Sequence, residues 1–171
     1  MAELIKINLF FLFLILTSSQ LLGQNSSIIK EGSQAENFRA TDTQGNKFEL
    51  NDFQDRFVLL NFSATACGPC WESYPTLDSI DQEYKNQLKV ITVHHDENME
   101  EQWNEIAENN NITLRSTSAW KIKNKPRVLE NYGIDGWPYY FLIDKDGVVV
   151  KKWFGFVEED MRGIVQEHLN P

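Results

Sequence analysis

The chain has 171 residues, with 25 acidic and 16 basic side chains and a formal net charge of −9 at neutral pH. This length is enough for one domain with a substantial hydrophobic core. Lysine and arginine form no run along the sequence, so the composition argues against a nucleic-acid-binding surface, and we expect no nucleic-acid partner. The acidic balance favours solubility and weak repulsion from anionic surfaces.

Residues 1–23 have the pattern of a signal peptide. Lys6 precedes the apolar stretch 7–16, which is too short for a comfortable transmembrane helix. An uncleaved membrane anchor is the alternative interpretation, and both interpretations predict an exported protein in the bacterial periplasm. The polar residues 24–36 are then expected to be a linker, and residues 37–171 to form the folded domain.

The rest of the chain alternates between apolar, strand-like runs and amphipathic, helix-like segments. Residues 38–50 have the pattern of a β-hairpin, with turn-forming residues at 43–46. Further strands are predicted at 57–62, 88–93, 112–114, 139–143 and 148–153, and helices at about 67–85, 98–110, 127–132 and 158–169. This order predicts an α/β fold in which helices cover both faces of a mixed central sheet.

The motif Cys67-Gly68-Pro69-Cys70 holds the only two cysteines of the chain and directly follows the apolar strand 57–62. Cys67 is predicted to lie at a helix N-terminus, where unpaired N–H groups and the helix dipole favour an anion. A cysteine in that place has a lowered pKa and becomes a nucleophile. Pro69 fits the first helical turn, where its missing N–H costs nothing. The pattern therefore indicates reversible dithiol–disulfide chemistry.

Two other uses of the cysteine pair are weaker alternatives. A closed zinc site needs two further ligands, and the three histidines, His94, His95 and His168, include no second pair at motif spacing. A purely structural disulfide between Cys67 and Cys70 closes too small a loop to constrain the unfolded chain much. His94 and His95 end a predicted strand, so one should point inward and one outward, and we interpret both as structural.

Four segments together resemble a known family, over about residues 32–169. They are the hairpin ending at 48–50, the strand 58–62 with its cysteine motif, the insert at about 99–114, and the stretch 132–147, which contains Trp137-Pro138. They resemble the thioredoxin superfamily, and more narrowly its exported TlpA/ResA-type thiol-disulfide oxidoreductases. The resemblance implies a thioredoxin-like fold with an N-terminal β-hairpin and a central insert.

The resemblance also implies roles for single residues. Cys67 would attack the substrate disulfide, and Cys70 would be the buried thiol that resolves the mixed disulfide. Pro138 would be a cis-proline facing the cysteines, which leaves the backbone of Trp137 to pair with an extended substrate. Trp137, with the spacer residues Gly68 and Pro69, is the expected substrate-binding surface. The redox-active cysteine pair needs no cofactor and no metal.

Several positions depart from the family pattern. Asn61 stands where thioredoxins carry a buried aspartate, and Ser73 stands where exported relatives often carry a glutamate. Glu72 is one place earlier on the helix and is expected to point away from Cys70. A carboxylate base for Cys70 is therefore missing from both places. Trp137 is either an apolar platform beside the sulfurs or an ordinary packing residue.

We therefore expect a disulfide reductase that acts on disulfide-containing exported proteins. A membrane-bound thiol electron donor is expected to reduce its cysteine pair back to the dithiol. Cytochrome c maturation, general disulfide repair and a stress pathway all fit this interpretation. A peroxiredoxin-like peroxidase is one alternative, although Ala64 stands where peroxidases usually carry threonine. A thioredoxin-fold module that binds extended peptides without turnover is the other, and the missing carboxylate is its best support.

Overall fold

The computed structural model describes residues 28–169, except 97–98, 111–112, 119–120 and 124. The predicted signal peptide or anchor at 1–23 and the first residues of the predicted linker lie outside the described residues. Within the described part of the chain, no helix is long and apolar enough to cross a membrane.

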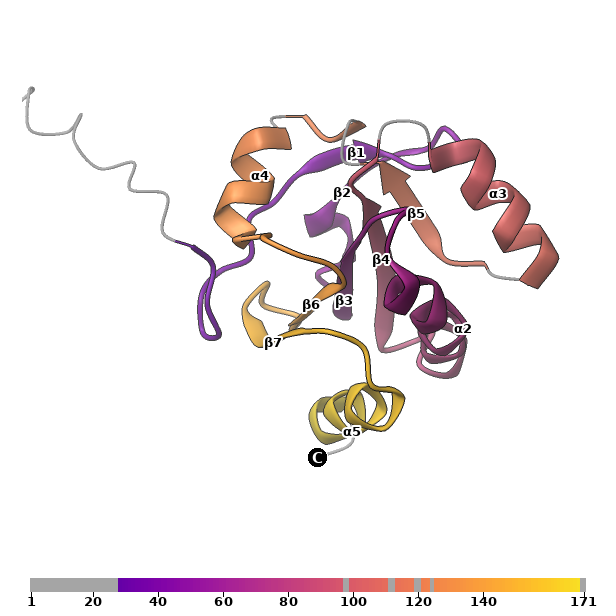
Figure 1. The fold of residues 1–171 in the computed structure, drawn as a ribbon. Coiled ribbons are helices and arrows are strands. Elements are labelled where there is room, and N and C mark those ends of the chain that lie inside the picture. Colours follow the sequence, from indigo (N-terminus) through magenta and orange to yellow (C-terminus); the bar gives the residue numbers. More distant parts are fainter. Residues whose placement is uncertain (1–27, 97–98, 111–112, 119–120, 124, 170–171) are drawn as a thin grey trace, which may run out of the picture.

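A five-stranded mixed sheet forms the centre of the molecule (Figure 1). In spatial order its strands are β5 (Arg115–Ser118), β4 (Leu88–His94), β3 (Phe57–Ser63), β6 (Tyr139–Ile143) and β7 (Val149–Phe154). The first three are parallel to one another, and β6 and β7 continue the sheet in antiparallel pairing. The central strands β3, β4 and β6 are apolar runs because both faces of the sheet are covered. The predicted mixed α/β architecture is confirmed.

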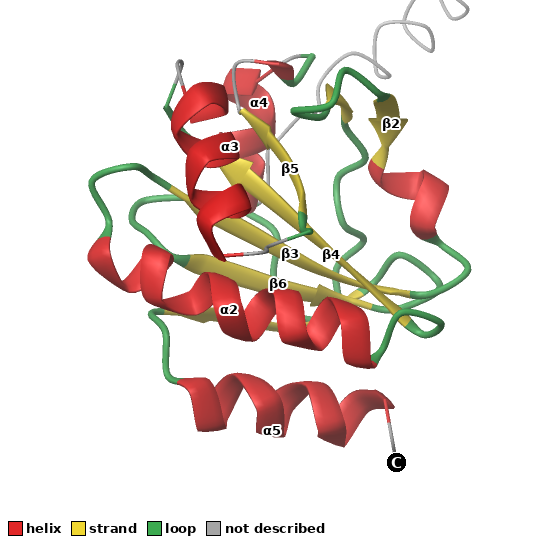
Figure 2. Ribbon diagram, turned by 90° about the vertical axis from the view of Figure 1, so that its right-hand side faces the viewer, coloured by secondary structure: helices red, strands yellow, loops and turns green. Residues whose placement is uncertain are grey.

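One face of the sheet is covered by α2 (Gly68–Glu83), α3 (Met99–Asn110) and α5 (Glu158–Leu169). Figure 2 shows α2 and α5 lying side by side beneath the sheet. The core on this face joins alternate strand residues to the inner faces of the helices; its members include Leu59, Val90 and Leu142 of the sheet, Leu77 and Ile80 of α2, and Met161 and Val165 of α5.

The opposite face carries α4 (Lys125–Tyr132) and the N-terminal hairpin, made of β1 (Arg39–Thr41) and β2 (Lys47–Glu49) and followed by the 3-10 turn η1 (Leu50–Phe53). An aromatic cluster forms its centre. The Phe141 ring meets the rings of Tyr132 and Phe62 edge-on, with centroids 5.0 and 5.8 Å away. Such edge-to-face contacts add to the stabilisation from burial of the rings.

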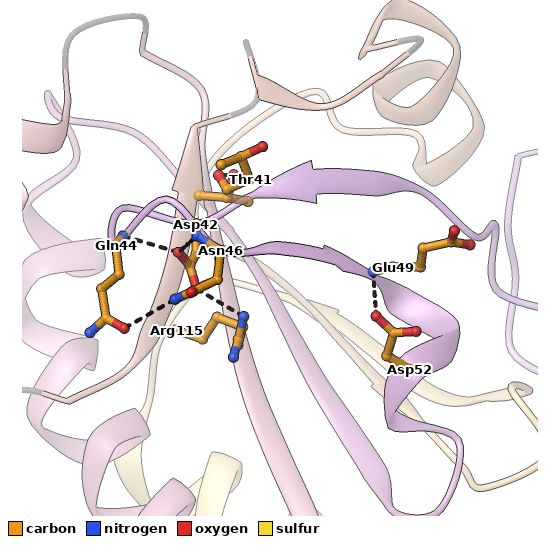
Figure 3. A network of polar contacts seen from close by, with 8 residues as sticks. Thr41, Asp42, Gln44, Asn46, Glu49, Asp52 and Arg115 are labelled. Carbon is orange, nitrogen blue, oxygen red and sulfur yellow. Dashed lines mark hydrogen bonds and ion pairs between the residues drawn. The ribbon is translucent and has the colours of Figure 1, made fainter.

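Asp42 fastens the turn of the hairpin to the edge of the central sheet (Figure 3). Its side chain is buried and accepts hydrogen bonds from the backbone N–H groups of Gln44 (3.0 Å) and Asn46 (2.8 Å). Its second oxygen accepts a hydrogen bond from Arg115 of β5 at 2.9 Å. The Arg115 guanidinium also lies 5.2 Å from the centroid of the Phe48 ring. These contacts explain why a short, two-stranded hairpin is held in one place.

Two sequence-based boundaries differ from the structure. The strand predicted at 112–114 is wrong for the described residues 113 and 114, because the ladder with β4 begins only where Arg115 pairs with Ile91; residue 112 lies outside the described residues. Thr113 instead donates its N–H to the Asp78 carboxylate. The segment 28–36, expected to be linker, packs on the domain. Ile29 is buried, Gly32 donates its N–H to the Val149 carbonyl oxygen at 2.8 Å, and residue 34 forms a bridge with residue 148. The buried side chain of Ile29 anchors this stretch on the domain.

Candidate active site

Cys67 and Cys70 form a disulfide, with their Cα atoms 5.3 Å apart, at the point where β3 leads into α2. Cys67 is the N-cap residue of the helix, with extended backbone angles, and the N–H of Cys70 points at both the carbonyl oxygen and the sulfur of Cys67. Cys67 keeps 8% of its surface exposed, whereas Cys70 is fully buried. An incoming group from solvent therefore meets Cys67 first.

The first turn of α2 presents one backbone donor, the N–H of Cys70, to the Cys67 sulfur. Gly68 and Pro69 occupy the first two helical positions and are exposed, and Pro69 has no N–H that would need a partner there. The 3.2 Å contact from the Cys70 N–H to Cys67 Sγ is the kind of hydrogen bond that stabilises a thiolate after reduction. The helix terminus thus favours negative charge on Cys67 rather than on Cys70.

Asp96 and Trp71 hold the loop between β3 and the disulfide. The Asp96 carboxylate accepts hydrogen bonds from the N–H (2.5 Å) and hydroxyl (2.7 Å) of Thr65. The Trp71 indole N–H donates to the Thr65 carbonyl oxygen at 2.9 Å. Burial alone would raise the pKa of Asp96, but the two hydrogen bonds from Thr65, together with the charge of His95, outweigh it, so the pKa is lowered. The sequence analysis assigned no role to Asp96 or Trp71.

The peptide bond between Trp137 and Pro138 is cis, as the resemblance implied. Pro138 is buried, and its carbonyl oxygen accepts a hydrogen bond from Gly155 at 3.0 Å. Trp137 is 36% exposed and lies against the ring of His95, with centroids 4.9 Å apart. The backbone N–H of His95 donates a hydrogen bond to the carbonyl oxygen of Ser63, the last residue of β3. The aromatic pair of His95 and Trp137 therefore lies at the end of β3 where the cysteine loop begins.

His95 belongs to this edge although sequence analysis assigned it only a structural role. The signal was available: β3 and β4 were both predicted as strands, and parallel neighbours end at the same edge of a sheet, where ligands of α/β proteins commonly bind. The expectation that one histidine points inward and its neighbour outward is confirmed, because His94 is fully buried and His95 is only partly so.

The redoxin family model matches residues 30–165 of this chain. The chain is also 34% identical over 141 residues to the thiol-disulfide oxidoreductase ResA of Bacillus cereus, covering 80% of this chain and 77% of that relative. The chain belongs to the redoxin family. The resemblance to ResA-type thiol-disulfide oxidoreductases is confirmed, and this redoxin is a thiol-disulfide oxidoreductase.

Two solved structures share the fold of this redoxin. The thioredoxin domain of a thiol-disulfide oxidoreductase from Bacteroides vulgatus superimposes with a TM-score of 0.73 at 28% identity, covering 83% of this chain and 99% of that one. An exposed lipoprotein thioredoxin from Streptococcus pneumoniae gives a TM-score of 0.64 at 26% identity, covering 78% and 100%. The thioredoxin-like architecture is therefore confirmed.

A buried hydrogen-bonded group lies behind the disulfide of the redoxin. Ser63 Oγ is 2.6 Å from the Tyr74 hydroxyl and 2.9 Å from His94 Nδ1. Burial lowers the pKa of His94 to about 3, so its ring is neutral in any physiological medium. The Tyr74 ring packs edge-on against Trp71 and Trp103. His94 therefore acts as an uncharged packing and hydrogen-bonding residue.

The two places where relatives carry a carboxylate near the second cysteine hold neutral side chains. Asn61 is fully buried, and among the described residues neither its amide nitrogen nor its oxygen has a hydrogen-bond partner. The Ser73 hydroxyl donates to the Cys70 carbonyl oxygen at 2.8 Å. Glu72 is exposed to solvent, in line with the prediction that it points away from Cys70. Among the described residues, no group of three or more His, Cys, Asp or Glu side chains is placed to hold a metal ion.

Proposed function

We propose that this redoxin reduces disulfide bonds of exported proteins, with Cys67 as the attacking thiolate and Cys70 as the resolving thiol. The observation that carries the proposal is the difference in exposure between the two cysteines. Cys67 lies at the helix N-terminus and reaches solvent, whereas Cys70 is fully buried. The Cys67 thiolate attacks a substrate sulfur and forms a mixed disulfide, and Cys70 then displaces the reduced product.

The substrate segment is proposed to lie across Gly68, Pro69 and Trp137. All three are exposed, and Trp137 offers a flat apolar surface next to His95. The carbonyl oxygen of Pro138 is already engaged by Gly155, so the backbone of Trp137 is the part of this turn proposed to pair with an extended chain. Buried Pro138 then shapes the turn that presents Trp137 against His95, at the end of β3 that leads to the cysteine loop.

Export is part of the proposal and rests on two observations. The sequence begins with a signal-peptide pattern, and one of the similar solved structures is described as an exposed lipoprotein. An oxidising compartment drives cysteine pairs toward the disulfide. A reductase working there depends on a membrane-bound thiol donor that returns electrons to Cys67 and Cys70.

A peptide-binding module without turnover is the second candidate, because neutral Asn61 and Ser73 provide no carboxylate base for Cys70. The peroxidase alternative has less support. Ala64 has no hydroxyl, and the Thr65 hydroxyl is bonded to Asp96.

Insulin reduction with a small dithiol as electron donor separates the reductase from the binding module. The native protein should accelerate precipitation of the insulin B chain, and Cys67→Ser should abolish this catalysis. Cys70→Ser should retain one mixed disulfide per molecule, visible as a mass increase that the dithiol reverses. Native protein that binds insulin without accelerating its reduction would favour the binding module.

A further inference from the structure

The two residues that directly follow β4, His95 and Asp96, contact segments on both sides of the candidate active site. β4 and β3 pair in parallel up to His94 and Ser63, and the N–H of His95 extends this pairing by donating to the Ser63 carbonyl oxygen at 2.8 Å. Successive side chains of an extended segment point in opposite directions. In agreement with this, the side chains of His95 and Asp96 contact two different segments of the chain.

Asp96 holds the cysteine loop, residues 64–67, which leads from β3 to the proposed nucleophile. Its carboxylate accepts hydrogen bonds from the N–H and the hydroxyl of Thr65, at 2.5 and 2.7 Å. Hydrogen bonds to a charged acceptor are stronger than those between neutral groups. Because Thr65 lies two residues before Cys67, the path of the cysteine loop is tied to the end of β4.

His95 holds the turn on the other side of β3. In the sheet, β3 lies between β4 and β6, and Trp137 lies just before β6. Strands two places apart in a sheet are separated by about 10 Å. The rings of His95 and Trp137 nevertheless have their centroids only 4.9 Å apart, with an angle of 46° between their planes. The two side chains therefore meet across the end of β3, where the cysteine loop begins.

The contact with His95 restrains a side chain that would otherwise move freely on the surface. Trp137 is 36% exposed, and its neighbour Pro138 is buried and accepts a hydrogen bond from Gly155 through its carbonyl oxygen. Ordering an exposed side chain when a ligand binds costs free energy, and a side chain that is already ordered avoids this cost. The Trp137 surface is thus preorganised by its packing against His95.

We propose that His95 is a positioning residue for the substrate and that, together with Asp96, it fixes Trp137 relative to the cysteine loop. The inference rests on the proposed function, in which Trp137 binds the substrate segment and Cys67 attacks it. His95 acts through the Trp137 ring and takes no part in the exchange between sulfur atoms. It therefore governs the affinity for an extended peptide that carries a disulfide, and has little influence on a small disulfide that does not reach Trp137.

Steady-state reduction of a symmetric peptide disulfide, made of two copies of one short peptide joined through their cysteines, tests this proposal with a small dithiol as electron donor. His95→Ala should raise KM at least about fivefold and leave kcat within about twofold of native, because the contact with the Trp137 ring is lost. His95→Phe restores an aromatic ring at this place and should keep KM within about twofold of native. His168→Ala, in the last turn of α5, is the matched histidine control and should change neither constant.

A small aromatic disulfide that releases a coloured thiolate is the second probe, and it reports attack by Cys67 alone. The reduced His95→Ala variant should react with it within about twofold of the native rate. The difference between the two probes separates the positioning of a peptide from the reactivity of the thiolate.

The contact of Asp96 has its own matched control on α2. Asp78 accepts hydrogen bonds from the N–H and the hydroxyl of Thr113, at 2.6 and 3.1 Å, in the same pattern as Asp96 and Thr65. Thr113 lies before the start of β5, whereas the disulfide follows the end of β3. Asp96→Asn should therefore raise KM for the peptide at least about threefold, and Asp78→Asn should leave it within about twofold of native.

A native KM for the peptide in His95→Ala would overturn the proposal. So would a KM in His95→Phe as high as in His95→Ala, because the imidazole group and not an aromatic contact would then be required. An equal loss with the peptide and the small disulfide would also overturn it, since the effect would lie at Cys67 itself, as would equal KM values in Asp96→Asn and Asp78→Asn. Native protein that does not react with the small disulfide would instead contradict the role of Cys67 in the proposed function.

Discussion

The two faces of the central sheet use the same strands for different purposes. On the face under α4 and the hairpin, β3 presents Val58, Leu60 and Phe62, all apolar and buried. On the face under α2, the same strand presents Leu59 and then two polar residues, Asn61 and Ser63. The polar residues gather toward the carboxyl end of the strand, where α2 begins. One face thus supplies stability, and one end of the other supplies the chemistry.

This comparison predicts that truncation on the apolar face has the largest effect on stability. Phe141→Ala should lower the free energy of unfolding by about 3–5 kcal/mol, because it removes a fully buried ring between Phe62 and Tyr132. Phe154→Ala, on the neighbouring strand but 61% exposed, should change it by no more than about 0.5 kcal/mol. Urea denaturation measures both, and equal costs would show that the aromatic cluster does not carry the stability of that face.

The chemical end of the α2 face should show a reactivity difference between its two cysteines. In the reduced protein near neutral pH, iodoacetamide should modify Cys67 at least about tenfold faster than Cys70, a difference of about 1.4 kcal/mol in activation free energy. Cys67 keeps 8% of its surface exposed at the helix N-terminus, and Cys70 has none of its surface in solvent. Peptide mapping by mass spectrometry gives the two rates. Faster labelling of Cys70 would reverse the assigned roles.

Asp96 should stabilise the cysteine loop in a pH-dependent way. Its pKa is lowered in the folded protein, so its contribution is present above the unfolded value of about 3.9 and is lost as pH falls through the folded value. Asp96→Asn keeps an acceptor for Thr65 but removes the charge, which should cost about 1 kcal/mol near neutral pH after allowance for partial exposure.

The cost of Asp96→Asn is measured by urea denaturation at several pH values. It should shrink toward zero as the pH falls below the lowered pKa of folded Asp96, where the carboxylate becomes protonated. A cost that stays constant down to that pH would mean that the carboxylate charge contributes nothing and that Thr65 is held by packing alone.

The smallest predicted effect on the free energy of unfolding comes from removing single hydroxyl groups on opposite faces of the sheet. Thr117→Val should lower the free energy of unfolding by about 1 kcal/mol, because the Thr41 carbonyl oxygen loses its partner. Thr92→Val should cost less than half of that, since its hydroxyl has no partner in the part of the chain that the structure describes. Thermal unfolding of the two variants tests the difference. A larger cost for Thr92→Val would show that the Thr92 hydroxyl makes a stabilising hydrogen bond in solution.

Much of the fold was predictable from local patterns. The last helix has the bounds 158–169 that its amphipathic spacing predicted, and strand β6 coincides with the apolar run 139–143. The strand expected at 112–114 was misplaced because β5 consists of polar residues, Arg115 to Ser118, with no apolar alternation to mark it. Its position is decided by pairing with β4, which a local pattern does not contain.

The sequence by itself determined where the redox chemistry lies, because a cysteine pair after an apolar strand and before a helix needs only neighbouring residues to be recognised. The resemblance to the thioredoxin superfamily also indicated that Asn61 and Ser73 stand where relatives carry a carboxylate. Only the tertiary structure placed His95 against Trp137 and aligned Asn61 with Thr92 and Tyr140 on the neighbouring strands. The physical reason is that helix and strand periodicity is encoded over a few adjacent residues, whereas strand register joins residues far apart in the chain and emerges only when the whole core packs.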